Sequence, residues 1–490
     1  MAAVFWFRQD LRTKDNEAFC YANKHHDTVY PIYILDDVNA KENKIGAASR
    51  LWLHHSLKSL NKSINNHLTF FVGDSIKIIK DILSAYDDIS AVYWNECYEP
   101  WILDIDQKLK NYLEEHHINV RIFSSATLTN IKSVLKEDKT PYKVFTPFYK
   151  HIYANNIDFN YTVAQKPTLH SLKSIDKNST IKGKRTHLDD LKLVSKLDWT
   201  DTVISNWNPG EEGAQKALDL FLQRGISNYK EGRNHPSKDN VSYLSPHLHF
   251  GEISVKNVVY KVYNKGNGEH GLDKNYHTFL SEIGWREFAS YSLYHFPEIT
   301  YKNLHAKFDD FEWISIKSEQ GKKYFEKWKK GQTGYPIVDA GMRQLWQTGY
   351  MHNRLRMIVG SFLVKNLLIH WKHGERWFWD CLCDADLASN NSGWQWAGGC
   401  GIDASPYFRI FNPILQGEKF DESGEYTRKY LPELKNLPNK YLFKPFDAPE
   451  DILTEAKVTL GTTYPKPIVD LKVSRDRALN EYHRINKKHK

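Results

Sequence analysis

Cysteine is scarce in this chain of 490 residues, which has five at scattered positions. A small, odd number of cysteines without a repeated spacing excludes a disulfide framework and is typical of a reducing compartment. Only Cys381 and Cys383 stand close together, and this C-x-C lacks the second pair of ligands that a zinc site requires. We therefore expect an intracellular protein without a bound metal.

Long apolar runs are also missing. The longest, Met357–Val364, ends at Lys365 and is far shorter than the roughly 20 residues of a membrane-spanning helix. The amino-terminal segment MAAVFWFRQDLR becomes charged too soon for a signal peptide. These absences predict a cytoplasmic protein, associated with the nucleoid if the organism is bacterial, and no membrane partner.

Neither sign of charge dominates, because the formal net charge is only +8. That modest basic excess permits a polyanionic partner without requiring one, so any basic patch must be local. Aromatic residues, in contrast, are abundant at 14%, including 15 tryptophans. Most of them must lie in the core, and the remainder offer planar surfaces for stacking.

The first third of the chain alternates between two patterns. Short β-branched or aromatic runs predict strands at Ala3–Phe7, Val29–Leu35, Leu68–Gly73, Ala91–Asn95 and Val120–Phe123. Helical periodicity separates several of them, at Ala47–Ile64, Ser75–Tyr86 and Trp101–His116. Strands joined by helices predict a doubly wound parallel sheet. The glycine fingerprint of nucleotide-binding sheets is absent after the first strand, where Arg8–Leu11 stand instead.

The composition changes at about Asn160, and Asn160–Asp198 reads as a polar surface connector. Beyond Asn208 the apolar spacing is helical, at Ala214–Arg224, Ser254–Tyr263, Tyr276–His295, Lys317–Lys330, Ile337–Gln347, His352–His370 and Glu375–Cys383. We predict an α/β domain at 1–130, a connector at 131–207, a helical domain at 208–480 and a basic tail at 481–490. Gly266–Gly271 matches G-x-G-x-x-G, but it follows a helix and reads as a linker.

One stretch stands out, Asp384–Trp396, written DADLASNNSGWQW. It places two carboxylates, two adjacent amides and two tryptophans between an apolar segment and a glycine-rich turn. Buried polar groups without hydrogen bonds cost about 1–3 kcal/mol each, so these need partners. The residues alone leave open whether the protein or a large polar ligand supplies them.

Two helix faces carry charge beside apolar side chains. Glu282, Trp285 and Arg286 share one face by their spacing. The second face carries Asn353, Arg356 and Met357. Three further arginines, Arg233, Arg354 and Arg409, are candidates for phosphate contacts. Each taken singly reads as an ordinary ion pair or a solvated charge.

Four long motifs resemble the photolyase/cryptochrome family: WFRQDLR (6–12), LSPHLHFGEIS (244–254), TGYPIVDAGMRQLWQTGYMHNRLRMIVGSFLVKNLL (333–368) and DADLASNNSGWQWAGGCGIDASPYFRIFNPILQGEKFD (384–421). The resemblance runs from about residue 3 to about residue 470. Within the family the chain is most similar to bacterial class I-type or plant-cryptochrome-like class III photolyases of cyclobutane pyrimidine dimers. It implies a Rossmann-like α/β antenna domain, a connector and an all-helical FAD-binding domain.

The resemblance also implies how FAD is held. Arg356 would pair with Asp384, and Asn390 would face flavin N5. Val241 stands where the family usually has threonine. The full set of expected FAD contacts is Tyr229, Val241, Ser242, Tyr243, Leu244, Ser245, Phe279, Arg286, Asn353, Arg356, Asp384, Ala385, Asp386 and Asn390.

Three tryptophans, Trp394, Trp371 and Trp313, match the family's chain that passes electrons to oxidised flavin. The antenna chromophore stays open between methenyltetrahydrofolate, a deazaflavin, a second flavin and none. Residues Glu42–Gly46 and Asn95–Asp106 fit no single antenna type, and His249 stands where some deazaflavin-binding members have lysine.

Substrate choice follows from a few positions. Photolyases of (6-4) lesions have two histidines where Asn353 and Met357 stand, so the resemblance implies cyclobutane dimers in UV-damaged DNA. Glu282 would stabilise the reduced dimer, and Trp285 and Trp396 would stack on it. The DNA-binding set is Arg233, Glu282, Trp285, Asn353, Arg354, Met357, Trp396 and Arg409.

The resemblance therefore implies a blue-light-driven deoxyribodipyrimidine photo-lyase, a carbon–carbon lyase that acts as a monomer with reduced FAD. Two rivals share the scaffold: a signalling cryptochrome and a DASH-type enzyme for single strands. A basic nucleic-acid-binding protein without flavin is the third.

Overall fold

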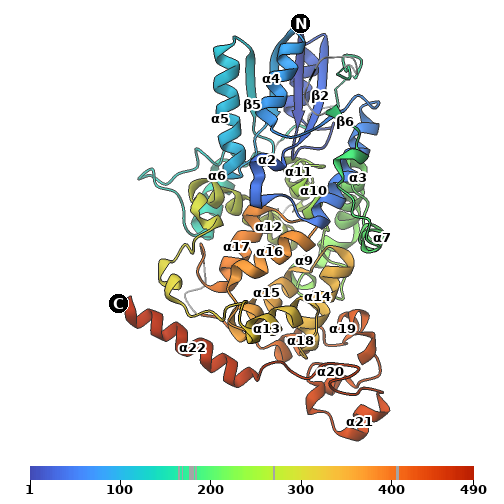
Figure 1. Cartoon of the computed structure of the whole chain (residues 1–490), viewed down its shortest axis with the longest axis vertical. Coiled ribbons are helices and arrows are strands. Elements are labelled where there is room, and N and C mark those ends of the chain that lie inside the picture. The colour runs from blue at the N-terminus through green and yellow to red at the C-terminus, as the bar shows by residue number, and fades with distance from the viewer. Residues whose placement is uncertain are drawn as a thin grey trace. The chain divides into compact units, whose positions relative to one another are not determined.

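The alternating first third of the chain folds into a six-stranded sheet of order β5-β4-β1-β2-β3-β6 in the computed structural model (Figure 1). The structure describes residues 1–159, 161–163, 166–167, 169–175, 181, 185–268, 271–403 and 408–489. The strands are β1 (Ala2–Phe7), β2 (Thr28–Leu35), β3 (Thr69–Val72), β4 (Ile89–Asn95), β5 (Asn119–Phe123) and β6 (Arg185–Thr186). The first five are parallel, which confirms the predicted sheet.

Helices cover both faces of this sheet because strand side chains alternate in direction. Val4 and Trp6 of β1 share one core with α4 and α5. Phe5 and Phe7 share the other with α1 and α3. These helices and the short α2 are α1 (Glu17–His25), α2 (Asp37–Ala40), α3 (Ala47–Ser63), α4 (Ser75–Ala85) and α5 (Pro100–Glu115).

The predicted connector is more than a surface segment. Its short strand β6 pairs antiparallel with β3, and Leu172 forms a parallel bridge with Val29. Leu172, Ile175 and Leu191 are buried. A few apolar residues in a polar stretch are enough to anchor it on the sheet, and composition alone hides them. Asn160 itself lies outside the described residues.

The chain divides into two units that do not follow its order. The first comprises Met1–Ser227, Ser242–Pro297 and Cys383–Ala388. The second comprises Asn228–Val241, Glu298–Leu382 and Ser389–Lys490. The predicted boundaries after residues 130, 207 and 480 stay predictions.

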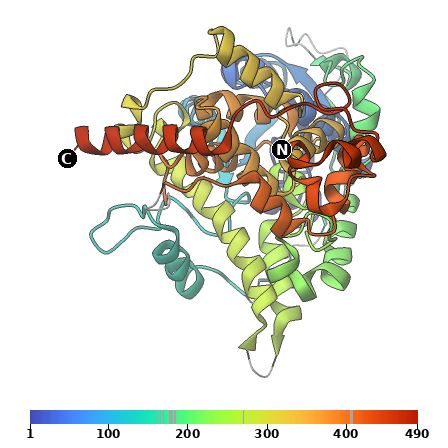
Figure 2. The ribbon, with the colours of Figure 1, turned by 90° about the horizontal axis from the view of Figure 1, so that it is seen from below.

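Several helices complete the first unit beside the sheet. They are α6 (Phe145–Asn155), α7 (Trp199–Ile204), α8 (Glu211–Leu220), α10 (Ser245–His249), α11 (Val255–Gly266) and α12 (Lys274–His295). The segment predicted at Ala214–Arg224 ends in a π-helical turn, Phe221–Gly225. Figure 2 shows α11 and α12 side by side, joined by the hairpin of β7 (Asn267–Gly268) and β8 (Gly271–Leu272). Residues 269–270 of the G-x-G-x-x-G match lie outside the described residues.

The second unit is helical in its described residues. Its helices are α9 (Tyr229–Gly232), α13 (Glu319–Lys329), α14 (Pro336–Thr348), α15 (Asn353–Ser361), α16 (Trp371–Cys381), α17 (Leu387–Gly398, shared with the first unit), α18 (Pro413–Phe420), α19 (Glu425–Tyr430), α20 (Asn439–Leu442), α21 (Glu450–Glu455) and α22 (Leu471–Lys488). Residues 404–407 of the 384–421 motif lie outside the described part.

The single helix predicted at His352–His370 was wrong. Helix α15 ends at Ser361 and passes into a π-helical turn, Phe362–Asn366. Leu368 then takes a left-handed φ of 51°, and His370 starts α16 by accepting a hydrogen bond from Lys372 N at 3.1 Å through Nδ1. Neither glycine nor proline marks this break, so the periodicity ran through it.

Among the described helices, none combines the length and the apolar character that crossing a bilayer would take. The described histidines, cysteines and carboxylates form no group of three or more that could hold a metal ion.

Candidate active site

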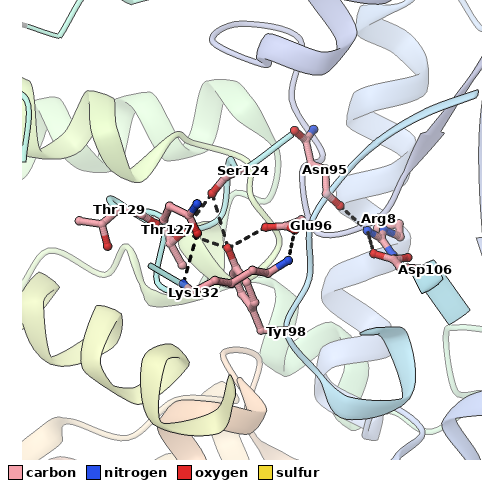
Figure 3. Close-up of polar contacts among 10 residues, drawn as sticks. Arg8, Asn95, Glu96, Tyr98, Asp106, Ser124, Thr127, Thr129 and Lys132 are labelled. Carbon is pink, nitrogen blue, oxygen red and sulfur yellow. Dashed lines mark hydrogen bonds and ion pairs between the residues drawn. The ribbon is translucent and has the colours of Figure 1, made fainter. Parts of the chain in front are cut away.

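A buried ion pair lies at the carboxyl ends of β1 and β4, the edge where parallel sheets bind ligands (Figure 3). Arg8 Nη1 lies 2.7 Å from Asp106 Oδ1, and a second nitrogen donates to the main-chain oxygen of Asn95. Nearby, Asn95 Oδ1 and Glu99 Oε2 are buried without a hydrogen bond to any described residue. The region Asn95–Asp106, where no single antenna type was predicted, therefore holds a neutralised pair and two buried acceptors without hydrogen bonds.

A second polar network fixes the loops after β4 and β5 (Figure 3). Lys132 pairs with Glu96, and the Tyr98 hydroxyl donates to Glu96 Oε2 at 3.2 Å. The same loop after β5 continues to Leu128 and Thr129. Their main-chain N–H groups donate to the buried carboxylate of Glu287 on α12, both at 2.9 Å. These contacts tie the loop after β5 to α12 within the first unit.

The polar stretch Asp384–Trp396, singled out in the sequence, begins beside α10. The Ser245 hydroxyl donates to Asp384 Oδ2 at 2.6 Å, and Asp386 N bonds to the main-chain oxygen of Asp384 at 2.7 Å. His249 Nδ1 lies 3.7 Å from Asp386 Oδ2 and makes no hydrogen bond to a described residue. Two carboxylates, a hydroxyl and an imidazole thus converge in the first unit, all from positions predicted for FAD or the antenna.

Two of the three residues predicted to share one face of α12, Arg286 and Trp285, are already in contact with other parts of the protein. Arg286 donates to the main-chain oxygens of Ala126 at 2.8 Å and Leu248 at 3.3 Å. Trp285 stacks on Phe145 with ring centroids 3.7 Å apart, and 37% of Trp285 is exposed. Phe145 therefore covers one face of this indole, a contact that local spacing cannot predict because the two residues are 140 positions apart.

In the second unit, three arginines gather around one histidine. His352 caps α15 by accepting from Arg354 N at 3.2 Å. Burial, and then Arg354, Arg233 and Arg356, lower the pKa of His352 to about 3. Arg354 also donates to Asn234 Oδ1 at 2.5 Å. A neutral imidazole among three guanidinium groups makes a strongly basic cluster, which suits an anionic ligand.

The side-chain amide of Asn390 has a fixed orientation. Its Nδ2 donates to the main-chain oxygen of Glu375 at 3.0 Å, and the neighbouring Asn391 donates to Glu375 Oε1 at 3.0 Å. One N–H of the amide is committed to Glu375, so the amide oxygen and the second N–H are the groups that Asn390 can offer to a ligand.

The three predicted electron-transfer tryptophans all lie in the second unit, where ring contacts through His370 connect two of them, Trp371 and Trp313. Trp394 packs so closely on α16 that a Cβ at Gly374 would come within 2.2 Å of its ring. Trp371 stacks on His370 at 5.4 Å, and His370 meets Trp313 edge-on at 5.2 Å. Trp394 and Trp371 are buried, whereas Trp313 is half-buried. The sequence did not identify His370 as the link.

Trp396 and Arg409, two residues predicted to contact DNA, line one pocket of the second unit. Ser361, Lys365 and Phe411 line it with them. Lys365 was missed, although a lone lysine at the end of the longest apolar run was its signal in the sequence.

Residues 3–168 match the DNA photolyase family, and residues 279–484 match the FAD-binding domain of DNA photolyase. A deoxyribodipyrimidine photo-lyase of Agrobacterium fabrum is 44% identical over 488 residues, which cover 99% of this chain and 98% of that protein. The chain belongs to the photolyase/cryptochrome family.

The chain is also similar to a photolyase of known structure and to a plant cryptochrome. The crystal structure of a bacterial class III photolyase from Agrobacterium tumefaciens superposes with a TM-score of 0.91 at 44% identity, covering 99% of this chain and 98% of that one. Cryptochrome-1 of Arabidopsis thaliana is 34% identical, covering 96% of this chain and 68% of that protein.

FAD is the cofactor of this photolyase/cryptochrome, and the described residues fit it. The carboxylates of Asp384 and Asp386 suit the N–H and hydroxyl groups of a flavin and its ribityl chain. The buried, unbonded Nδ1 of His249 also fits a polar ligand beside Asp386. The predicted pair of Arg356 and Asp384 joins residues of different units and stays a prediction.

Proposed function

We propose that this chain is a blue-light-dependent photolyase that splits cyclobutane pyrimidine dimers in UV-damaged DNA. The observation that carries the proposal is the pocket that Trp396 and Arg409 line together. The pocket itself has room for about one water molecule. The indole and the guanidinium beside it nevertheless offer a stacking surface for a flipped base and a positive charge for its phosphate.

Reduced FAD, when bound, supplies on excitation by blue light the electron that opens the dimer and receives it back. The chain's own residues then have separate tasks. Asn390 presents its amide oxygen to flavin N5 without offering a carboxylic proton. Glu282 hydrogen-bonds the carbonyl edge of the 5′ base and stabilises the charge that builds on the dimer.

The path Trp394–Trp371–His370–Trp313 delivers electrons to FAD when it is oxidised. Indole is suited to this because it gives up an electron without first losing a proton. This path restores the active redox state and takes no part in the splitting of the dimer, so the two activities are separable by mutation.

Arg233, Arg354 and Arg409 bind DNA phosphates, and Trp285 with Trp396 stacks on the lesion. Affinity should therefore fall steeply with salt, since phosphate contacts release counterions. We further propose a monomer that acts on cytoplasmic DNA. The four alternatives for the antenna are methenyltetrahydrofolate, a deazaflavin, a second flavin and no antenna pigment.

The decisive experiment illuminates purified, chemically reduced protein with a duplex that holds one thymine dimer. Chromatography should show intact thymines appearing only in blue light, with the dark sample unchanged. No thymine recovery from FAD-loaded protein would refute the proposal. A single-stranded substrate run in parallel identifies a DASH-type enzyme if only single strands are repaired.

The 34% identity to Cryptochrome-1 of Arabidopsis thaliana makes a light-signalling role the second candidate. It predicts photoreduction without repair and no preference for damaged DNA. The same illuminated sample distinguishes the two roles.

A further inference from the structure

Lys365 is a buried cation without an acidic partner. It lies in the π-helical turn Phe362–Asn366 and is only 3% exposed. Its Nζ donates to the main-chain oxygen of Arg409 and lies 4.5 Å from the ring centroid of Phe408. No carboxylate in the described part of the chain pairs with it. Burying an unpaired ammonium costs several kcal/mol, so a site that keeps one has a use for it.

The segment that Lys365 holds carries a predicted phosphate contact. Ser361, one turn before Lys365, accepts a hydrogen bond from Phe411 N at 3.2 Å. Lys365 and Ser361 therefore hydrogen-bond the main chain at the two ends of the segment 409–411. Together with Trp396, they line the pocket in which Arg409 lies.

The π-helical turn is itself anchored on its other side. Asn366 donates to Ser474 Oγ of α22 at 2.9 Å, and Arg477 donates to the main-chain oxygen of Asn366 at 2.8 Å. Single π-helical turns inside helices recur at functional sites because they re-aim side chains. Here the turn directs Lys365 towards the 409–411 segment from a fixed base.

We propose that Lys365 is a positioning residue for DNA binding: it holds the main chain of Arg409 beside Trp396 and adds its own positive charge to the pocket. The inference rests on the proposed function, because it takes Trp396 and Arg409 as the DNA-contacting pair. Two cations without a carboxylate at one pocket attract a DNA phosphate more strongly than either alone.

The charge of Lys365 changes near neutral pH. Burial, and then the charge of Arg409, lower the pKa of Lys365 to about 7. The other titratable group that faces it is Cys400, whose thiol stays neutral because burial raises its pKa to about 12. As pH rises through about 7, Lys365 loses its charge while Arg409 keeps its own, so DNA affinity should decrease.

The test measures the affinity of the FAD-loaded protein for a dimer-containing duplex by fluorescence anisotropy in the dark. Wild type should bind several-fold more tightly at about pH 6 than at about pH 8.5. Lys365→Met should lose about tenfold at the lower pH and show little dependence on pH. Lys365→Arg, which keeps its charge throughout, should bind well at both. Lys322→Met, an exposed lysine on α13, is the matched control.

A Lys365→Met protein that retains FAD absorbance and binds like wild type at both pH values overturns the inference. If Lys365→Met does not fold, equal pH dependence of wild type and Lys365→Arg overturns it instead. In the double variant Lys365→Met/Arg409→Ala the two losses should fall short of their sum, because one residue acts through the other. Repair in the light, measured on the same samples, separates the two proposals. If the protein repairs DNA but its affinity does not depend on Lys365, only this inference is refuted. If its affinity depends on Lys365 but no repair occurs, only the proposed function is refuted.

Discussion

Trp371 donates a hydrogen bond through its indole Nε1 to Asn303 Oδ1 at 2.8 Å. Trp371 is 1% exposed, so Asn303 supplies the hydrogen-bond acceptor that water would supply to an indole at the surface. When an indole gives up an electron, its N–H becomes more positive, and a hydrogen bond to a charged donor is worth about 1.5–3 kcal/mol. Asn303 therefore stabilises Trp371 in the oxidised form that electron transfer requires.

Replacing Asn303 by leucine should slow photoreduction of FAD about tenfold, since about 1.4 kcal/mol corresponds to a factor of ten. The rate of flavin bleaching under blue light measures it. Asp309→Asn is the matched control, because Asp309 accepts the other hydrogen bond of Asn303, at 2.7 Å, and does not touch the indole. Equal loss in both variants would mean that only local structure was disturbed.

Trp371→Phe should abolish photoreduction while leaving dimer repair by chemically reduced protein intact. Phenylalanine fills most of the space but is far harder to oxidise than indole. Trp199→Phe on α7 of the first unit controls for the loss of a tryptophan. Unchanged photoreduction in Trp371→Phe would show that electrons take another route.

Asn390→Asp should change the redox behaviour of the flavin more than the fold. The aspartate loses the 3.0 Å hydrogen bond to the main-chain oxygen of Glu375 and brings a carboxyl group to the position assigned to flavin N5. We expect a proton donor there to favour a protonated one-electron form, visible as a red-shifted absorption band after illumination. Asn155→Asp, an exposed asparagine at the end of α6, should leave the spectrum as in wild type.

Two histidines should make the protein sensitive to acid. His352 and His370 each start a helix as hydrogen-bond acceptors, and burial lowers their pKa values to about 3 and about 4. Because the unfolded chain binds their protons from about pH 6.5 downward, the free energy of unfolding should fall as pH drops from about 6.5 towards 4, by roughly 2–4 kcal/mol for each histidine.

Asparagine caps helices without titrating, so His352→Asn and His370→Asn should each flatten the pH dependence of thermal unfolding. His116→Gln, an exposed histidine after α5, should leave it as it is. If acid sensitivity is identical in all four proteins, these two caps do not cause it.

Glu287 is expected to be a strong contributor to stability. Its carboxylate is 0% exposed and accepts from Leu128 N, Thr129 N and the Thr129 hydroxyl. Glu287→Ala leaves these donors buried without a partner, which should lower the free energy of unfolding by roughly 3 kcal/mol or more. Glu287→Gln keeps one acceptor and should lose less. Chemical denaturation compares them with the exposed-site control Glu115→Ala.

The sheet was predictable because each strand is a short apolar run between helices of regular spacing. Ala3–Phe7 and Val29–Leu35 were placed within one residue of β1 and β2 for that reason. Strand β6 was not, since two residues, Arg185 and Thr186, carry no pattern of their own and form a strand only because β3 offers an edge.

The site shows the same division between local and long-range information. The motifs identified which residues to watch, and spacing put Glu282, Trp285 and Arg286 on one face. The stack of Trp285 on Phe145, the pair Arg8–Asp106 and the grip of Lys365 on Arg409 join positions far apart in the chain. Only the folded molecule brings them together.

The absent side chain of Gly374 has its own consequence. Trp394 occupies the space that any larger residue at 374 would need, with its ring 2.2 Å from where a Cβ would stand. Any residue with a side chain at position 374 would therefore have to displace the Trp394 ring, so the place of this predicted electron carrier depends on a glycine in another helix.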